Sequence, residues 1–227
     1  MKHLLLLHGA IGTKDQMEPL AKSLSKHFLV STINFSGHGG TAMPDKFSIP
    51  FFAEKVVAWL KQNKIDRIDI FGYSMGGYVA MYMAAHYPTF VNKVVTLGTK
   101  YNWSPVTAKK EVGMLNPEVI ETKLPKFAAQ LQQKHLPNDW KTVLQKTAAM
   151  LLQMGENPPL QNKDFETIEN EVLLLVGDRD KMVTLEETID IYRLLKAGCL
   201  CVLPTTAHPI ELLNIHTTSL LIQDFFQ

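Results

Sequence analysis

Cysteine is nearly absent from this chain: 227 residues contain two, Cys199 and Cys201. Two cysteines cannot form the disulfide framework of a small secreted domain. They lie two residues apart in an apolar run, so we expect reduced thiols on one core-facing side of a strand.

Long hydrophobic runs are also missing. No segment approaches the roughly 18 apolar residues of a transmembrane helix, and Leu4–Leu7 is shorter than a signal-peptide core of roughly 7–15 residues. The sequence therefore predicts a cytoplasmic protein.

The sequence also lacks an excess of either charge. It has 23 Lys and Arg against 22 Asp and Glu, a formal net charge of +1. This balance offers no basic surface to nucleic acid or to an anionic membrane. Histidine pairs and cysteine pairs at zinc-site spacing are missing too. We therefore expect no nucleic-acid partner, no membrane partner and no metal.

What the chain does have is a regular alternation of short apolar runs with segments of helical period. The runs are nearly continuous in Leu, Val and Ile, which is typical of strands buried on both faces of a parallel sheet. Possible capping boxes at Thr13 with Gln16 and at Thr184 with Glu187 suggest two helix starts, and Pro209 suits the first turn of a third helix. The alternation predicts an α/β fold with a doubly wound, six-stranded, mostly or wholly parallel sheet. The expected strands are His3–Leu7, Phe28–Ile33, Arg67–Phe71, Lys93–Leu97, Val172–Val176 and Cys199–Leu203.

Residues 101–166 interrupt this alternation. The segment has no clear strand, follows a helical pattern and is divided by several prolines. We interpret it as a helical cap inserted between the fourth and fifth strands. Residues 1–100 and 167–227 would then form the α/β core. Lys100 and Trp103 open the insertion and are possible substrate-pocket residues, although a solvated lysine and a packed tryptophan are simpler interpretations.

The segment DIFGYSMGGYVAM, which begins at Asp69, places Ser74 between two glycines. An apolar run ends at Phe71, and a small-residue helical segment begins at Gly76. A Gly-x-Ser-x-Gly motif between a strand and a helix forms a sharp, strained turn that exposes the serine, and the glycines leave room for the chain to pass itself. Ser74 is therefore a candidate nucleophile.

A serine hydroxyl is a weak nucleophile unless a base activates it and an acid orients that base. The segment after the fifth strand offers two acids, Asp178 and Asp180, and the segment after the sixth offers His208. All three would lie at the carboxyl edge of the sheet together with Ser74. Open α/β sheets bind their ligands at this edge.

Taken together, these motifs resemble the α/β-hydrolase superfamily over nearly the whole chain. They are HG after the first strand, SGHG after the second, Gly-x-Ser-x-Gly after the third, Gly-x-x-Asp after the fifth and a histidine after the sixth. The resemblance implies that Ser74 is the nucleophile, Asp180 the acid and His208 the base. It also implies an oxyanion hole made by the backbone amides of Ala10 and Met75, and no cofactor.

The sequence departs from the family pattern in two places. Family members usually have two further strands ahead of the HG strand, so we expect a reduced sheet here. Asn34 also occupies the position of a usual aspartate in the second-strand motif, which affects the loop rather than the chemistry. The resemblance makes His8 and His38 structural supports of their loops. The histidines outside the motifs, His135 among them, are expected to be ordinary surface or core residues.

The expected function is hydrolysis of a small carboxylic ester, or a related acyl compound, through an acyl-enzyme on Ser74. Two alternatives remain open from the sequence. The same triad serves carbon–carbon bond hydrolases and lyases, and some members of the fold are small-ligand receptors with slow turnover. The sequence does not indicate the natural substrate or the oligomeric state.

Overall fold

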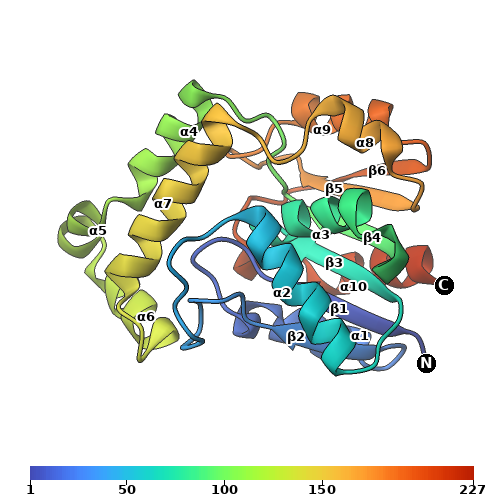
Figure 1. The fold of residues 1–227 in the computed structure, drawn as a ribbon, viewed down its shortest axis with the longest axis horizontal. Helices are drawn as coiled ribbons and strands as arrows, with labels where there is room; N and C mark the ends of the chain where they lie inside the picture. Colours follow the sequence, from blue (N-terminus) through green and yellow to red (C-terminus); the bar gives the residue numbers. More distant parts are fainter.

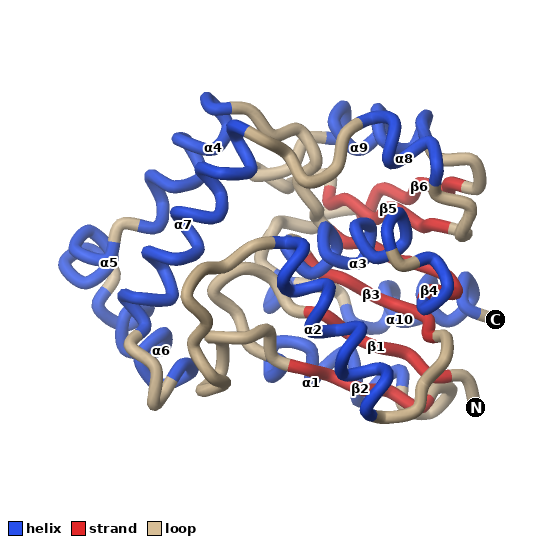
Figure 2. The backbone as a smooth tube through the Cα atoms, in the orientation of Figure 1, coloured by secondary structure: helices blue, strands red, loops and turns tan.

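The computed structural model describes all 227 residues and contains one six-stranded sheet (Figures 1 and 2). The strand order is β2-β1-β3-β4-β5-β6, and every neighbouring pair is parallel. The predicted doubly wound parallel sheet is confirmed. The strands are β1 (His3–Leu7), β2 (Leu29–Ile33), β3 (Ile68–Tyr73), β4 (Val91–Leu97), β5 (Val172–Gly177) and β6 (Gly198–Leu203).

Helices cover both faces of the sheet, which explains why the strands are apolar throughout. Successive strand residues point to opposite faces, so Leu4 and Leu6 join one buried cluster whereas Leu5 and Leu7 join the other. The first face carries α1 (Glu18–Leu24) and α10 (Ile215–Phe226). The second face carries α2 (Ile49–Gln62), α3 (Met75–His86), α8 (Asn162–Thr167) and α9 (Leu185–Leu194).

Four further helices lie between β4 and β5 in the sequence, and they stand beside the carboxyl edge of the sheet, at the left of Figure 1. Proline occupies the first position of three of them, where its missing N–H leaves no helical bond unmade. Three of the prolines that divide the segment therefore begin helices. No helix combines the length and the apolar composition that a membrane span requires. The four are α4 (Pro105–Val112), α5 (Pro117–Lys123), α6 (Pro125–His135) and α7 (Trp140–Glu156).

We call residues 105–156, which contain these four helices, the helical segment. It has a small buried cluster of its own, centred on Leu131, Trp140 and Leu144. The helix that follows, α8, contacts α3 and α9 instead.

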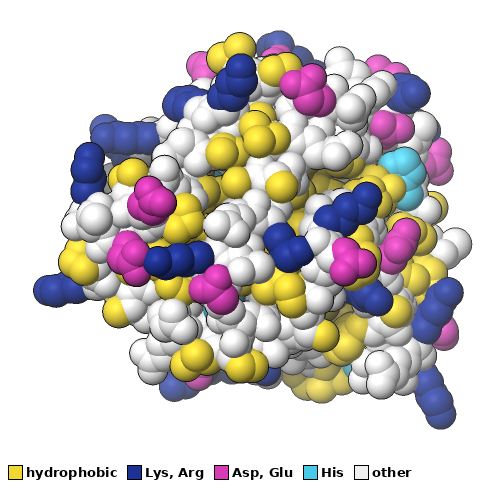
Figure 3. Space-filling view, turned by 60° about the vertical axis from the view of Figure 1, so that its left-hand side comes forward, with side chains coloured by type: hydrophobic (Ala, Val, Ile, Leu, Met, Phe, Trp, Pro, Cys, Tyr) yellow, Lys and Arg dark blue, Asp and Glu magenta, His cyan; other side chains and the backbone are white.

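Positive and negative side chains are interspersed on the face that Figure 3 turns forward, in keeping with the balanced composition. The division of the chain into a core and a cap at residues 101–166 stays a prediction.

Only one of the two expected capping boxes forms. Thr184 and Glu187 each bond to the backbone of the other at the start of α9. Thr13 precedes a short 3-10 helix, Lys14–Met17, and its side chain makes no capping bond. The Thr13 hydroxyl donates to Asp15 instead, and the Gln16 side chain donates to Glu211. The expected helix at Pro209 is also delayed. A 3-10 turn, Ile210–Leu212, comes first, and α10 begins afterwards.

The expectation that both cysteines lie in the core is wrong. Cys199 is exposed and Cys201 is half-buried, and both are free thiols. Both belong to β6, which is an edge strand with a neighbour on one side only. An apolar run therefore predicts a strand more securely than it predicts burial at the edge of a sheet.

Candidate active site

Ser74 occupies a strained turn between β3 and α3. Its backbone angles are φ 51° and ψ −116°, a conformation that costs a residue with a side chain on the order of 1–3 kcal/mol. Two hydrogen bonds from neighbouring chain segments hold it. The Ser74 N–H donates to the Leu97 carbonyl at 2.8 Å, and the Thr99 hydroxyl donates to the Ser74 carbonyl at 3.1 Å.

The two glycines of the motif are required by the space around them. A Cβ on Gly72 would lie 2.4 Å from the Gly76 carbonyl oxygen. A Cβ on Gly76 would lie 2.4 Å from the Leu7 carbonyl oxygen on β1. Side chains cannot approach backbone so closely, so both positions need glycine for the turn to close against the sheet.

Asp180 and His208 meet at the same edge of the sheet. Asp180 Oδ2 lies 2.8 Å from His208 Nδ1, and the two side chains are 2% and 11% exposed. The other carboxylate oxygen accepts the backbone N–H groups of Met182 and Val183 at 2.8 and 2.9 Å. Since the carboxylate only accepts, His208 Nδ1 carries the proton and Nε2 is left unprotonated in the neutral ring.

The charge of Asp180 is stabilised by its surroundings. Burial raises the pKa of the Asp180 carboxyl, but the hydrogen bond and charge of His208 and the two backbone amides outweigh burial and lower the pKa below its ordinary value. Three hydrogen bonds to the ionised form explain this direction. The group therefore stays a carboxylate near neutral pH and holds the imidazole in one tautomer.

Asp178, the competing acid, makes no hydrogen bond or ion pair with His208. Its Oδ1 accepts the Thr206 N–H at 3.1 Å, and its Oδ2 lies 3.7 Å from Arg179 Nε. The first bond ties the loop after β5 to the loop after β6. Asp178 therefore orders the two loops that carry Asp180 and His208.

Four strand ends converge on this site. The Tyr73 hydroxyl, next to Ser74, donates to the His208 carbonyl at 3.0 Å. Gly98, at the end of β4, has φ 56°, and a Cβ there would lie 3.2 Å from Asp180 Oδ2 and 3.3 Å from His208 Nδ1. No hydrogen bond joins Ser74 Oγ to His208 in this structure. Such bonds often tighten only when substrate binds.

Ala10 and Met75 line the same cavity as Ser74. Met75 is the first residue of α3, and the first amides of a helix have no acceptor within the helix. Ala10 belongs to a turn closed by the Gly12 N–H on the Gly9 carbonyl at 3.2 Å. These two amides are the candidates for an oxyanion hole.

The cavity that contains Ser74 has a volume of about 80 Å³ and is mostly apolar. Pockets for larger ligands measure roughly 300–1,000 Å³, so this one suits a small group. Both residues expected at the pocket from the sequence line it, Lys100 and Trp103. Lys100 is only 14% exposed and is not a solvated lysine. The remaining lining residues are Ile49, Tyr78, Glu111, Met150, Leu151, Met154, Met182 and Val183.

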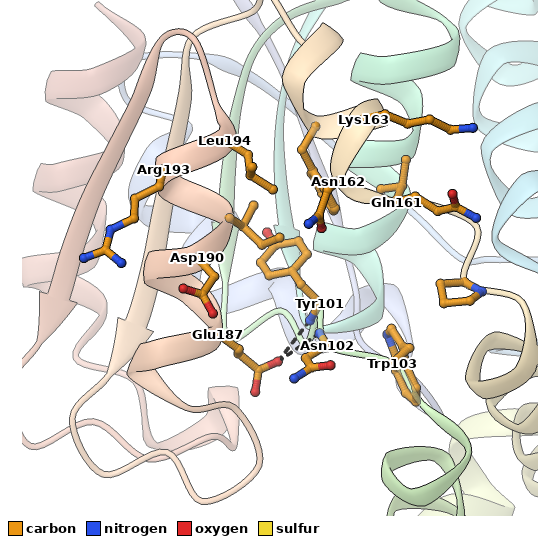
Figure 4. Close-up of a pocket in the computed structure, with 14 residues that line it drawn as sticks. Tyr101, Asn102, Trp103, Gln161, Asn162, Lys163, Glu187, Asp190, Arg193 and Leu194 are labelled. Atoms are coloured by element: carbon orange, nitrogen blue, oxygen red, sulfur yellow. Dashed lines mark hydrogen bonds between the residues drawn. The ribbon is translucent and has the colours of Figure 1, made fainter.

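A larger, more open cleft of about 840 Å³ shares Trp103 with this cavity (Figure 4). Its walls come from α8, α9 and the chain around Tyr101, and Glu187, Asp190 and Arg193 of α9 are among its polar side chains. It contains none of the three candidate triad residues. Ser74, the candidate nucleophile, lines the smaller cavity.

A sequence profile of the alpha/beta hydrolase fold matches residues 2–169, more than half of the chain. The chain belongs to the α/β-hydrolase family. The resemblance drawn from the motifs is thereby confirmed, and relatives that carry the name esterase show that the protein is a hydrolase enzyme.

One such relative of this hydrolase is the pimeloyl-[acyl-carrier protein] methyl ester esterase of Neisseria meningitidis serogroup C. It is 26% identical over an alignment that covers 100% of this chain and 94% of that protein. A Haemophilus influenzae relative is 29% identical over 94 residues, which are 41% of this chain and 33% of that protein.

Solved structures of the family superpose over the whole hydrolase. A thermophilic esterase from Thermogutta terrifontis has a TM-score of 0.81 at 19% identity, covering 100% of this chain and 89% of that one. A meta-cleavage product hydrolase from Pseudomonas fluorescens has a TM-score of 0.76 at 18% identity, with coverage of 100% and 90%. At these identities the likeness shows the fold alone.

Three buried histidines of the hydrolase form a cluster beside the turn that contains Ala10. The rings of His8 and His38 lie 5.2 Å apart, and those of His38 and His135 lie 5.7 Å apart. Burial lowers the pKa of His8 to about 4 and lowers the pKa values of His38 and His135 as well. No group of three metal-binding side chains in the structure is placed to hold an ion.

His135, at the end of α6, bridges two loops of the sheet edge. Its Nδ1 accepts the Gly39 N–H at 3.2 Å, so its Nε2 must donate to the Ile11 carbonyl at 3.0 Å. Ile11 follows Ala10 and has a positive φ of 51°. The sequence offered no signal for this role, because the contact joins residues far apart in the chain.

Proposed function

We propose that this hydrolase cleaves a small carboxylic ester through a covalent acyl-enzyme on Ser74. The observation that supports this most directly is the 2.8 Å bond between Asp180 and His208 at the sheet edge that also carries the strained Ser74. A strained serine, a fixed imidazole and an apolar cavity are the parts that acyl transfer needs.

In the proposed reaction, His208 Nε2 takes the proton of the Ser74 hydroxyl as Oγ attacks the ester carbonyl. The tetrahedral intermediate collapses, and His208 returns the proton to the departing alkoxide, which leaves as an alcohol. A water molecule then loses its proton to His208 and attacks the acyl-Ser74 carbonyl. The second collapse releases the carboxylic acid and restores Ser74 with its proton.

The remaining residues serve this reaction without forming covalent bonds. Asp180 keeps the imidazole oriented and stabilises its charged form. The Ala10 and Met75 amides hold the negative oxygen of each tetrahedral intermediate, and one such donor is typically worth about 2.7–4 kcal/mol. These steps use protein groups and water, and no cofactor takes part in the proposed reaction.

The helical segment would act as a cap that closes the acyl pocket. Met150, Leu151 and Met154 of α7 and Glu111 of α4 line the cavity together with Ser74. A cap in this place excludes water and sets the size of the acyl group. The Neisseria relative is named for cleavage of a methyl ester, which supports ester hydrolysis here. A small-molecule substrate and a cytoplasmic location remain our predictions.

Turnover of an activated ester tests the proposal against its alternatives. We expect the protein to hydrolyse short para-nitrophenyl esters through many cycles. A ligand receptor with vestigial chemistry would stop after about one equivalent of nitrophenol. A carbon–carbon bond hydrolase would cleave a vinylogous diketone faster than any ester of the series, and that result would replace the proposed ester substrate.

A further inference from the structure

The cavity at Ser74 has one polar wall, formed by Lys100 and Glu111. The rest of its lining is apolar or aromatic, apart from Ser74 itself. Glu111 lies on α4 and is 5% exposed, and Lys100 precedes the helical segment with its side chain 14% exposed. A charged pair buried in a small apolar cavity is costly unless its hydrogen-bonding capacity is used.

The hydrogen bonds of this pair are incomplete. Lys100 Nζ donates to the Met182 carbonyl and lies 3.5 Å from Glu187 Oε2 and 3.7 Å from Glu111 Oε1. The distance to Glu111 is too long for a hydrogen bond. An ammonium has three N–H donors, so Lys100 keeps a donor for a further partner.

The two acids around Lys100 differ in how fully they are used. Glu187 accepts the backbone N–H groups of Tyr101, Asn102 and Thr184. Glu111 accepts no hydrogen bond from any protein group, and its only ion-pair partner is Lys100 at 3.7 Å. Glu187 is therefore explained by the fold. Glu111 is a buried acceptor without a partner, and it lines the cavity.

We propose that Lys100 and Glu111 form a subsite for a hydroxyl group on the acyl part of the substrate. The inference rests on the proposed function of Ser74, and it narrows the substrate to hydroxylated acyl esters. A substrate hydroxyl placed about 2.8 Å from both Lys100 Nζ and Glu111 Oε1 would accept a hydrogen bond from the ammonium and donate one to the carboxylate. That arrangement spans the 3.7 Å gap between the two side chains and adds a hydrogen-bond partner to each.

The charge of the wall favours a neutral group over an anion. Two carboxyl groups, Glu111 and Glu187, lie within 3.7 Å of a single ammonium, so the formal sum of the three is −1. A substrate carboxylate would meet an acid in a poorly solvated cavity, where like charges repel strongly. A terminal methyl group would leave Glu111 and the free N–H donor of Lys100 without a partner.

Matched esters test the subsite. We would measure kcat/KM for para-nitrophenyl esters of equal chain length that end in a methyl, a hydroxyl or a carboxylate group, over a range of lengths. At the length that reaches Lys100 and Glu111, we expect the hydroxyl ester to exceed the methyl ester by about tenfold, the scale of one hydrogen bond to a charged group. The carboxylate ester should be the slowest.

The preference should depend on both side chains. Glu111→Leu and Lys100→Met should each lower the hydroxyl-to-methyl ratio about tenfold. The double variant makes the wall apolar, removes both charges together and should reverse the preference. Glu121→Gln is the matched control, because Glu121 is an exposed acid of the helical segment paired with Lys141 at 2.7 Å. Its ratio should equal that of the wild type.

Failure of the subsite and failure of the proposed function give different results. If the wild type hydrolyses none of the esters, the proposed function itself is wrong. If it hydrolyses them but the hydroxyl and methyl esters react equally at every length, the subsite is wrong and the function stands. A wild-type ratio retained in the double variant would overturn the subsite as well. If a single variant fails to fold, the subsite is still tested by the ratio of kcat/KM between the hydroxyl and methyl esters in the wild type and in the double variant.

Discussion

Asp178 and Asp180 lie two residues apart in one loop, and their contacts give them different tasks. Asp178 bonds to the backbone of Thr206, whereas Asp180 bonds to His208. The Gly-x-x-Asp spacing favoured Asp180 before the structure, through the family resemblance. Spacing alone could not separate the two acids, because it does not tell which way each side chain points from a tight turn.

Asparagine substitutions separate the two tasks. Asp180→Asn should lower kcat on the order of 10⁴-fold, the loss seen when the acid of a serine-protease triad becomes an amide and favours the wrong tautomer. Asp178→Asn keeps a side-chain acceptor for the Thr206 N–H, so its kcat should stay within a few-fold of the wild type. Steady-state kinetics on one ester checks both. Equal losses in the two variants would mean that the acid lies elsewhere.

The methionines of α7 set the depth of the cavity in this account. Met150 lines the cavity with Ser74, and Met150→Ala should shift the preferred acyl chain longer by about one or two methylenes, each worth roughly 0.8 kcal/mol of burial. Met114→Ala is the control, because Met114 is 49% exposed and does not line the cavity. The measurement is kcat/KM over an ester series. If Met150→Ala keeps the wild-type profile and loses only stability, α7 does not set specificity.

At the scale of elements, the strands were predictable and the long-range contacts were not. A parallel strand buried on both faces leaves a continuous apolar run, and all six runs became strands. The prolines indicated breaks between helices but not that they would start α4, α5 and α6. The bridge from His135 to Ile11 and Gly39 left no trace in the sequence, since neither partner is near it in the chain.

The His135 bridge yields a prediction about α6. His135→Ala removes both bonds that α6 makes to the turns of Ile11 and Gly39, so the Ala10 amide should lose its fixed position. Small displacements of positioning groups can cost up to about 100-fold, and we expect kcat to fall at least about tenfold while KM changes little. His216→Ala, at an exposed site, is the control. An unchanged kcat in His135→Ala would show that α6 does not position the oxyanion turn.

At the scale of the whole molecule, the buried histidines link stability to pH. The folded-state pKa values of His8, His38 and His135 are all lowered by burial, so the folded protein binds fewer protons than the unfolded chain. The contribution of these histidines to the free energy of unfolding is therefore fully present above the unfolded pKa of about 6.5. It is lost as pH falls from there towards the folded-state pKa values. Burial and the charge of His135 lower the pKa of His8, and the hydrogen bond to the Gly9 carbonyl raises it; no acid contributes to the shift.

Urea unfolding at two pH values checks this linkage. Since the folded pKa of His8 is about 4, His8 alone should lower the free energy of unfolding by about 2 kcal/mol between about pH 7 and about pH 5. The window lies above the ordinary range of carboxyl groups. His8→Asn should show a smaller decrease than the wild type. A free energy of unfolding that does not change over this window would contradict the neutral state of the cluster.

The sheet edge that carries the candidate triad could be predicted from the sequence, whereas the cavity beside it could not. The order of motifs along the chain predicted which edge of the sheet carries Ser74, Asp180 and His208, because the carboxyl ends of parallel strands share an edge. The cavity was not predictable, because its lining residues come from separate parts of the chain: α3 and loops of the core on one side, and α4 and α7 on the other. In the sequence, Glu111 is an ordinary acid within a polar helical stretch. Its burial beside Lys100 follows from packing alone.

Covalent labelling by a serine-directed phosphonate tests directly whether Ser74 is the nucleophile. Mass spectrometry of the intact protein and of its peptides locates the adduct. We expect one adduct per chain, on Ser74, and none in a Ser74→Ala variant that folds as the wild type does. An adduct on another residue, or stoichiometric labelling of Ser74→Ala with normal ester turnover, would contradict the assignment of Ser74 as the nucleophile.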